Sequence, residues 1–271
     1  MQRFGTILTV TVWGLASAAY GLLLAGAALT QPIRRRHLAF AASLAFALVA
    51  VAAGTLTDTF WPNLLVPGVL LLGGYWLSGF FFRDPQPWLE AWLMRVDHAV
   101  QAEEWMEWVP RPLAELLELA YAMDYVVVGG GAIYAATFGT EAVAYYWSLV
   151  LASELASFAP MPWLRSRPPR AVATPYALLE GAQTGGADRY LRRLNTFILD
   201  GASIQANTLP SGHVSGAVAA ALGVMAVDGL TGSWLMVAAG LIAIAAVAGR
   251  YHYVVDCVAG AAVALVFSSL M

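Results

Sequence analysis

Eight long apolar segments constrain the fold of this chain more than any other feature. Each is close to the roughly 20 residues that an α-helix needs to cross the hydrocarbon core of a membrane. A helix also satisfies its own backbone hydrogen bonds in lipid. The chain is 60% hydrophobic and 11% charged, whereas soluble domains are roughly 25% charged. We therefore predict an all-α, polytopic membrane helix bundle with about eight transmembrane helices. The predicted spans are about 5–29, 38–57, 62–82, 112–137, 140–159, 212–229, 232–249 and 252–270.

Two polar segments interrupt the apolar pattern. Residues 83–111 are too charged to span a membrane and contain four tryptophans, which predicts an amphipathic helix at the headgroup level. Residues 160–211 form the longest loop, and loops of that length are usually functional or disordered. We predict an N-terminal pair of transmembrane helices at 1–58 and a six-helix core at 59–271.

The charge and cysteine content exclude several classes of protein. The formal net charge is −3, and no basic run suits a nucleic acid. All 14 basic residues are arginine, and Cys257 is the single cysteine, so an internal disulfide is impossible. We therefore expect no nucleic-acid partner, and the apolar segments predict that the lipid bilayer surrounds the chain.

The predicted topology brings distant polar residues to one face of the membrane. The fifth span ends near Pro160, the sixth begins near Gly212, the seventh ends near Gly249 and the eighth begins near His252. Because two hairpin crossings separate these four ends, they lie on one side. The arginines at 165–170, His213 and residues 250–256 are therefore expected to converge.

These residue types suit phosphoryl transfer. His252 and Asp256 are four residues apart on one helical turn, where a carboxylate orients the imidazole and makes its other nitrogen a better nucleophile. His213 begins another helix, whose free N–H groups suit a phosphate. One histidine attacks phosphorus and the other protonates the leaving oxygen. The expected phosphate-binding residues are Arg165, Arg167, Arg170, Arg250, Ser211 and Gly212.

Three sequence motifs resemble those of the type 2 phosphatidic acid phosphatase superfamily, which comprises membrane lipid phosphatases and phosphotransferases. The Pro210-Ser211-Gly212-His213 motif matches fully, Arg167-Pro168 matches the end of the first motif, and His252 with Asp256 matches the end of the third. The resemblance covers roughly residues 60–270. It implies that His252 forms a phosphohistidine, that Asp256 orients it, and that His213 is the general acid and then the base. It also implies that no metal and no cofactor are required.

The chain departs from the family pattern at two positions. The lysine of the first motif would fall at Pro160, and the arginine of the third motif would fall at Ala246. Arg165 or Arg170 is expected to replace the lysine, while Arg250 stands two residues before His252. The resulting Arg-x-His-Tyr-x-x-Asp pattern resembles the branch of inositol phosphorylceramide and sphingomyelin synthases. The acceptor is therefore left open between water and an alcohol.

Several alternative interpretations remain open. The lipid substrate ranges from phosphatidic acid or phosphatidylglycerol phosphate to a polyprenyl pyrophosphate or a sphingolipid-type acceptor. The protein could instead be a transporter or scaffold with a degenerate site, a serine hydrolase using Ser211 or Ser215, or a metal protein using His213, His252 and Asp256. Other polar and aromatic residues are expected to have no catalytic role. Tyr251 and Tyr253 are expected at the membrane interface, and Asp97 and His98 on a solvated face. Arg189, Arg192 and Arg193 are expected to be surface anchors.

The orientation in the membrane is predicted differently by two signals. The exclusive use of arginine hints at a GC-rich genome, so we expect a bacterial inner-membrane protein. The resemblance implies an extracytoplasmic active site. Arginines at 34–36, 83, 95 and 111 share the motif face, which favours a cytoplasmic site by the positive-inside rule. We predict an extracytoplasmic site.

Overall fold

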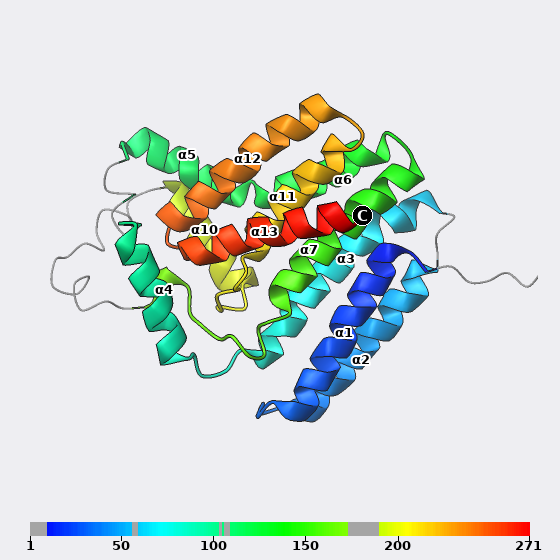
Figure 1. Cartoon of the computed structure of the whole chain (residues 1–271), viewed down its shortest axis with the longest axis horizontal. Coiled ribbons are helices and arrows are strands. Elements are labelled where there is room, and N and C mark those ends of the chain that lie inside the picture. The colour runs from blue at the N-terminus through cyan, green and yellow to red at the C-terminus, as the bar shows by residue number, and fades with distance from the viewer. Residues whose placement is uncertain (1–9, 56–58, 103–104, 106–108, 173–189) are drawn as a thin grey trace, which may run out of the picture.

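A computed structural model describes residues 10–55, 59–102, 105, 109–172 and 190–271. This part of the chain is an all-α bundle without strands, apart from a single bridge between Ser166 and Asn207 (Figure 1). The helices are α1 (Val12–Thr30), α2 (Arg36–Gly54), α3 (Phe60–Ser78), η1 (Gly79–Phe81), α4 (Pro87–Ala99), α5 (Arg111–Ala122), α6 (Asp124–Ala136), α7 (Thr140–Phe158), η2 (Pro169–Ala171), α10 (Tyr190–Ala202), α11 (Gly212–Met225), α12 (Gly229–Ala248) and α13 (Val254–Leu270).

All eight predicted apolar segments contain helix, but they do not all qualify alone as membrane spans. Helices α1, α2 and α12 are long and apolar enough, as is α3 together with η1. The segment predicted at 112–137 is broken between α5 and α6 with a bend of 50°, and it makes a fifth candidate if counted as one span. Helices α11 and α13 are apolar but shorter. Together these helices indicate a polytopic integral membrane protein.

Helix α7 lies at the centre of the bundle. It packs against α1, α3, α6, α11 and α13 (Figure 1). Its buried side chains include Tyr146 and Leu149, together with the polar residues Ser153, Glu154 and Ser157. These polar groups lower the apolar character of α7, although it is among the most deeply buried helices of the chain.

The N-terminal hairpin of α1 and α2 is closely packed. A Cβ atom on Gly14 would lie 2.8 Å from the Cα atom of Gly54, so the two backbones meet at a distance that only glycine permits. Helix α1 also packs on α3 and α7, which attaches the hairpin to the remaining helices.

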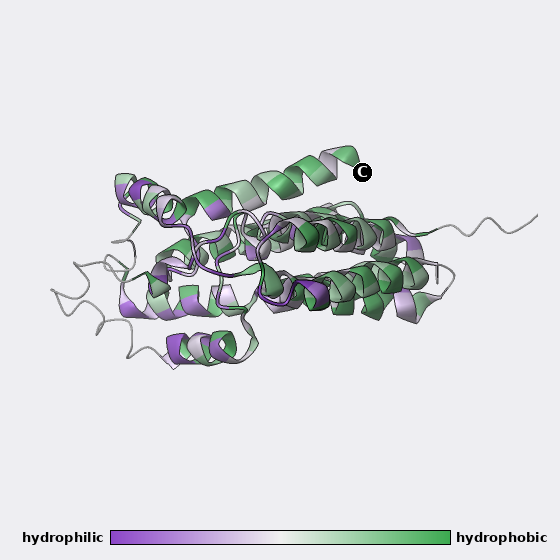
Figure 2. Ribbon diagram, turned by 90° about the horizontal axis from the view of Figure 1, so that it is seen from below, coloured by the Kyte–Doolittle hydropathy of each residue, from purple (hydrophilic) through white to green (hydrophobic). Residues whose placement is uncertain are grey.

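Helix α4 is amphipathic, as predicted for the polar segment at 83–111. Trp88 and Trp92 are exposed, whereas Leu93 is fully buried. Most hydrophilic residues lie toward the end of the molecule that holds α4, α5 and α10 (Figure 2). The solvated position expected for Asp97 is wrong, because its carboxylate is buried and accepts a hydrogen bond of 3.0 Å from the Val254 N–H at the start of α13. Asp97 therefore ties α4 to the first turn of α13, while His98 is exposed as expected.

Candidate active site

Backbone hydrogen bonds join three segments that are distant in the sequence. The Arg170 N–H donates to the Arg250 carbonyl at 3.0 Å, and the Ser211 N–H donates to the Asp256 carbonyl at 2.9 Å. Helices α11 and α13 approach so closely that a Cβ atom on Gly260 would lie 2.5 Å from the Ser211 carbonyl oxygen. The convergence predicted from the count of spans is confirmed.

His252 lies in the short connection before α13 and faces Asp256. Its Nδ1 atom is 3.4 Å from Asp256 Oδ2, and both side chains are buried. The same carboxylate oxygen accepts a 2.9 Å hydrogen bond from the Tyr253 N–H, which fixes its position. The contact with His252 does not have hydrogen-bond geometry, and catalytic hydrogen bonds often tighten only when substrate binds. With Nδ1 directed at Asp256, the other ring nitrogen is left for chemistry.

His213 faces His252 from the first turn of α11. The two imidazole centroids are 5.6 Å apart with their planes tilted by 59°. Tyr121 of α5 stacks on His213 at 5.1 Å, and the edge of Tyr125 approaches it at 6.2 Å. The aromatic side chains of α5 and α6 therefore hold His213 in place.

Arg170 is the arginine that lies beside the two histidines. Its guanidinium is 5.3 Å from the centre of the Tyr251 ring, and its charge acts on both His213 and His252. The interfacial position expected for Tyr251 is wrong, because its ring is buried and stacks on Tyr121 at 3.9 Å. Tyr253 is also fully buried, and its hydroxyl donates to the Arg167 carbonyl at 3.1 Å. Tyr251 therefore adjoins the site through Tyr121, whereas Tyr253 packs against Leu89 and Leu93 of α4.

The structure places the other predicted phosphate-binding arginines differently. Arg167 forms a bidentate ion pair with Glu90 of α4, with Nε–Oε1 and Nη2–Oε2 distances of 3.0 and 2.8 Å. These hydrogen bonds lower the pKa of the Glu90 carboxyl. Arg165 donates to the Pro162 carbonyl and lines a cavity with Arg83. Arg250 accepts from Arg170 through its backbone and adopts a positive φ of 59°. Of the four arginines, Arg170 is therefore the one whose guanidinium lies at the histidines.

The two candidate serines support the first turn of α11. Ser211 caps the helix by accepting from the Val214 N–H at 3.4 Å. Ser215 donates to the Gly212 carbonyl and accepts from Ser157 at 2.9 Å. A Cβ atom on Gly212 would lie 2.2 Å from Phe158, so a side chain there would displace the α11 start. The residues described by the structure contain no group of three or more His, Cys, Asp or Glu placed to hold a metal ion.

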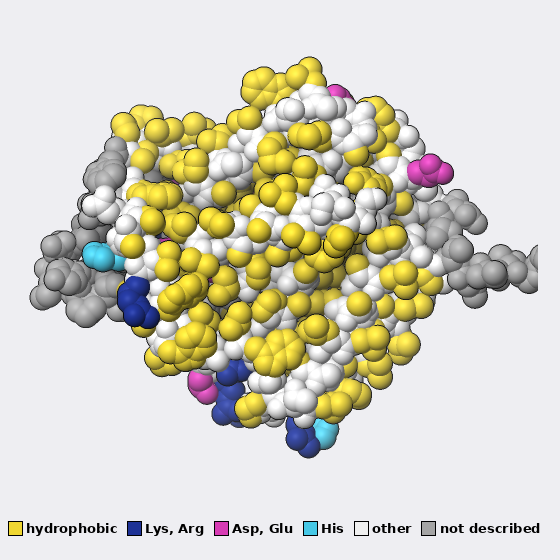
Figure 3. Space-filling view, in the orientation of Figure 1, with side chains coloured by type: hydrophobic (Ala, Val, Ile, Leu, Met, Phe, Trp, Pro, Cys, Tyr) yellow, Lys and Arg dark blue, Asp and Glu magenta, His cyan; other side chains and the backbone are white. Residues whose placement is uncertain are grey.

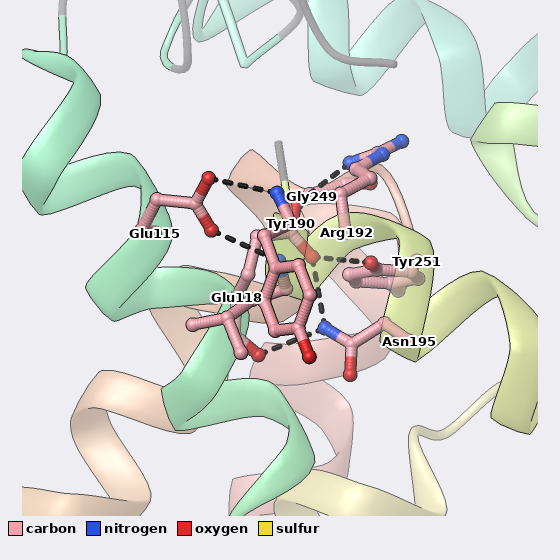
Figure 4. Close-up of polar contacts among 8 residues, drawn as sticks. Glu115, Glu118, Tyr190, Arg192, Asn195, Gly249 and Tyr251 are labelled. Atoms are coloured by element: carbon pink, nitrogen blue, oxygen red, sulfur yellow. Dashed lines mark hydrogen bonds and ion pairs between the residues drawn. The ribbon is translucent and has the colours of Figure 1, made fainter. Parts of the chain in front are cut away.

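A buried carboxylate behind the site was not predicted from the sequence. Glu118 of α5 accepts from Arg192 and Asn195 of α10, at 3.0 and 2.8 Å, and from the Tyr251 hydroxyl at 2.5 Å (Figure 4). One turn earlier, Glu115 accepts from the N–H groups of Tyr190 and Leu191 at the start of α10. Glu118 thus links α10 to Tyr251, whose ring lies 5.3 Å from the Arg170 guanidinium.

The surface position expected for Arg192 is wrong, because it pairs with the fully buried Glu118 and lies 5.3 Å from the Tyr251 ring. Arg193 is exposed as expected, and Arg189 lies outside the described residues. The sequence contains a spacing that is consistent with this cluster of Glu118, Tyr251, Arg192 and Asn195. Glu118 and Tyr121 share one face of α5 at a spacing of three residues, as do Arg192 and Asn195 on α10.

We expect the burial of His252 to make stability depend on pH. Burial first, and then the charge of Arg170, lower the pKa of His252 to about 3, whereas an unfolded histidine titrates near pH 6.5. As the pH falls below about 6.5, His252 of the unfolded chain gains a proton that the folded chain does not, so the contribution of His252 to the free energy of unfolding falls by about 2 kcal/mol at pH 5.

The measurement is the thermal midpoint in detergent at pH 7.5 and pH 5 for the wild type and His252→Gln. The fall in the midpoint should be smaller in the variant, because glutamine does not titrate. An equal fall in both proteins would contradict the assignment of a neutral, buried His252.

The fold and site define a class of protein: a polytopic helical membrane protein with two facing histidines, an acid behind one of them and an arginine beside both. The family model described as the PAP2 superfamily, the type 2 phosphatidic acid phosphatases, matches residues 89–270. This is well over half of the chain, and the chain belongs to that superfamily. The matched region begins in α4 and contains every residue of the site. No curated protein and no solved structure matches the chain.

Proposed function

We propose that this PAP2 superfamily member is a metal-independent lipid phosphate phosphatase that works through a phosphohistidine. The free ring nitrogen of His252 attacks phosphorus, the bond from phosphorus to the lipid oxygen breaks, and His213 protonates that oxygen. Water then attacks the phosphohistidine while His213 removes its proton, which releases phosphate and regenerates His252. Asp256 orients His252 and stabilises its positive charge in the intermediate.

The observation that carries this proposal is the facing pair of histidines at 5.6 Å, with Asp256 behind His252. A phosphoryl group between the rings would contact the nucleophile on one side and present the leaving oxygen to His213 on the other. Arg170 is close enough to add charge stabilisation to the phosphoryl oxygens. The start of α11 adds the positive end of the helix dipole, while the Gly212 N–H already donates to Thr208 Oγ1 at 3.3 Å.

The substrate class follows from the position of the site. His213 begins α11, and His252 lies between the end of α12 and the start of α13. In a membrane bundle the ends of apolar helices lie at the headgroup level. We therefore propose a phosphorylated lipid such as phosphatidic acid or a polyprenyl pyrophosphate, presented from an inner membrane with the site on the extracytoplasmic side.

A second candidate is a lipid phosphotransferase that passes a phospho-head group to an alcohol. The Arg250-x-His252-Tyr253-x-x-Asp256 pattern favours it, and so does the burial of His252, which is only 5% exposed and therefore poorly accessible to water. In this reaction an alcohol replaces water in the second step, with His213 as its base. A non-catalytic transporter or scaffold is the remaining alternative.

The test uses the purified chain in detergent with EDTA, a panel of lipid phosphates and pyrophosphates, and alcohol acceptors such as inositol or diacylglycerol. We expect phosphate release without an acceptor. A new phospholipid that forms only when an alcohol is added would favour the phosphotransferase. Absence of both products across the panel would leave the non-catalytic alternative, and loss of activity in EDTA would contradict a metal-independent mechanism.

A further inference from the structure

A cavity that shares no residue with the candidate active site lies where the N-terminal hairpin meets the end of α3. Its volume is about 710 Å³. The residues that line it, called the arginine pocket below, are Ile33, Arg34, Arg35, Phe80, Phe82 and Arg83. None of these residues belongs to the candidate active site, and all precede the region matched by the family model. The pocket is therefore a separate feature of this chain.

The position of the pocket corresponds to the headgroup level of a membrane. Helix α1 ends at Thr30, α2 begins at Arg36 and α3 ends at Ser78. These are three of the helices that are long and apolar enough to span. Their ends meet beside the pocket, so its opening lies where lipid headgroups begin. Arginine side chains gather at this edge of the molecule, near the α1–α2 turn (Figure 3).

The charges in and beside the pocket favour an anion. No carboxylate among the described residues pairs with Arg34 or Arg35. Arg83 donates to the Pro32 carbonyl at 2.6 Å and pairs with Asp84 at 3.2 Å, through side chains that are largely exposed. A smaller adjoining cavity shares Arg83 and adds Arg165. Four arginines thus face a single aspartate.

Two further observations indicate unsatisfied donors, one in the adjoining cavity and one at the arginine pocket itself. The Nε atom of Arg165 is buried and has no hydrogen-bond partner in the structure. Helix α2 begins at the pocket without a side-chain cap, so the N–H groups of its first turn add to the positive potential. Guanidinium groups and helix N-termini are both well suited to phosphate oxygens.

The apolar part of the pocket distinguishes a lipid from a free anion. Phe80 is 38% exposed, and Phe82 and Ile33 also line the pocket beside the arginines. Inorganic phosphate has nothing to place against these side chains, whereas a phospholipid places its glycerol and the upper part of its acyl chains there.

We propose that the arginine pocket binds the headgroup of an anionic phospholipid, separately from the substrate at the histidines. The lipid phosphate lies between Arg34, Arg35 and Arg83, and its acyl chains follow the apolar surface at the end of α3. The bound lipid joins the N-terminal hairpin to the end of α3.

The test measures lipid binding to the delipidated full chain by native mass spectrometry in detergent. Phosphatidylglycerol should bind at least about tenfold more tightly than phosphatidylcholine, because each arginine near a headgroup strengthens binding to anionic lipid. The triple variant Arg34→Gln, Arg35→Gln, Arg83→Gln should weaken phosphatidylglycerol binding by about tenfold or more. The double variant Arg34→Gln, Arg35→Gln keeps the Arg83–Pro32 contact and should show most of the same loss.

The matched control changes three exposed arginines elsewhere, Arg95→Gln, Arg111→Gln and Arg193→Gln, and removes the same charge. Its phosphatidylglycerol binding should stay close to that of the wild type. Equal losses in the control and the triple variant would overturn the proposal, because binding would then reflect general surface charge. So would unchanged binding in both arginine-pocket variants.

Two further measurements distinguish lipid binding at the arginine pocket from binding at the histidines and from binding of a free anion. Arg170→Gln, which changes the candidate active site, should leave phosphatidylglycerol binding intact, and a loss would assign the lipid to the histidines instead. Inorganic phosphate at millimolar concentration should not displace the lipid. Complete displacement would replace the proposal with a simple anion site.

Discussion

Replacing His252 with alanine is expected to lower phosphate release by at least about 10⁴-fold, the scale seen when a nucleophile is removed from an enzyme. The reason is that the proposed phosphohistidine cannot form without the ring that faces His213 at 5.6 Å. The measurement is the initial rate with the lipid that is most active in the panel. Incorporation of ³²P into the protein from labelled substrate should disappear in the same variant.

The His213→Ala variant separates the two histidine roles. Loss of a general acid costs about 10²- to 10⁴-fold with a lipid alcohol as leaving group. An aryl phosphate needs little protonation of its leaving oxygen, so its phosphoenzyme should still form. The phosphoenzyme should then accumulate, because His213 is also the proposed base for water. Asp256→Asn should reduce the rate of phosphoenzyme formation without preventing it.

The control for these variants is His37→Ala, which changes an exposed histidine on α2 outside the site. Its activity should equal that of the wild type. Phosphate release in His252→Ala at more than a few per cent of the wild-type rate would contradict the proposed nucleophile. Labelling of His252→Ala with ³²P at another residue would point to a different intermediate.

Replacing Glu118 with alanine is expected to destabilise the protein by about 3 kcal/mol, because breaking a buried ion pair leaves an uncompensated charge. The variant leaves Arg192, Asn195 and the Tyr251 hydroxyl without their common acceptor. The Tyr251 ring, which contacts both Tyr121 and Arg170, should then be less well positioned. Thermal unfolding in detergent measures the first effect.

The second effect distinguishes positioning from general stability. At a temperature where the variant is fully folded, we expect kcat to fall by about tenfold or more, since small displacements in a site are costly to the rate. Glu118→Gln keeps the shape and an acceptor oxygen, so it should recover part of this loss. A Glu118→Ala protein with wild-type stability and kcat would contradict the role of the cluster.

Glu115→Ala is the matched control on the same helix. Glu115 accepts hydrogen bonds from the Tyr190 and Leu191 N–H groups at the start of α10 (Figure 4). Its removal should resemble the loss of a helix cap, about 1 kcal/mol, and kcat should be unchanged. The comparison tests the buried Glu118 network and not the α5–α10 contact in general.

Local spacing explains which parts of the site were predictable. His252 and Asp256 are four residues apart at a helix start, so their proximity follows from helix geometry alone. Ser211 precedes the first turn of α11 and caps it as such residues do. The meeting of His213 with His252 required only a count of membrane crossings. Each of these predictions depends either on the repeat of the α-helix or on the number of residues needed to cross a membrane.

The partners of the arginines do not follow from local spacing. Arg167 and Glu90 are 77 residues apart, and nothing in either local sequence indicates that they form a pair. The same holds for Arg192 and Glu118, which are 74 residues apart. A motif can state that an arginine is near the site, but the direction of a long side chain depends on the nearest carboxylate in space.

The sequence by itself determined the helical class, the apolar segments that form the bundle and the family to which the chain is similar, because hydrophobic length and short motifs are local properties. The tertiary structure alone decided that Arg170 is the arginine beside the histidines and that the Tyr251 ring is buried against Tyr121. It also decided that Arg165 belongs to a different cavity. These outcomes depend on which side chains become neighbours when α4, α5 and α10 pack against the bundle, and such contacts have no fixed spacing along the chain.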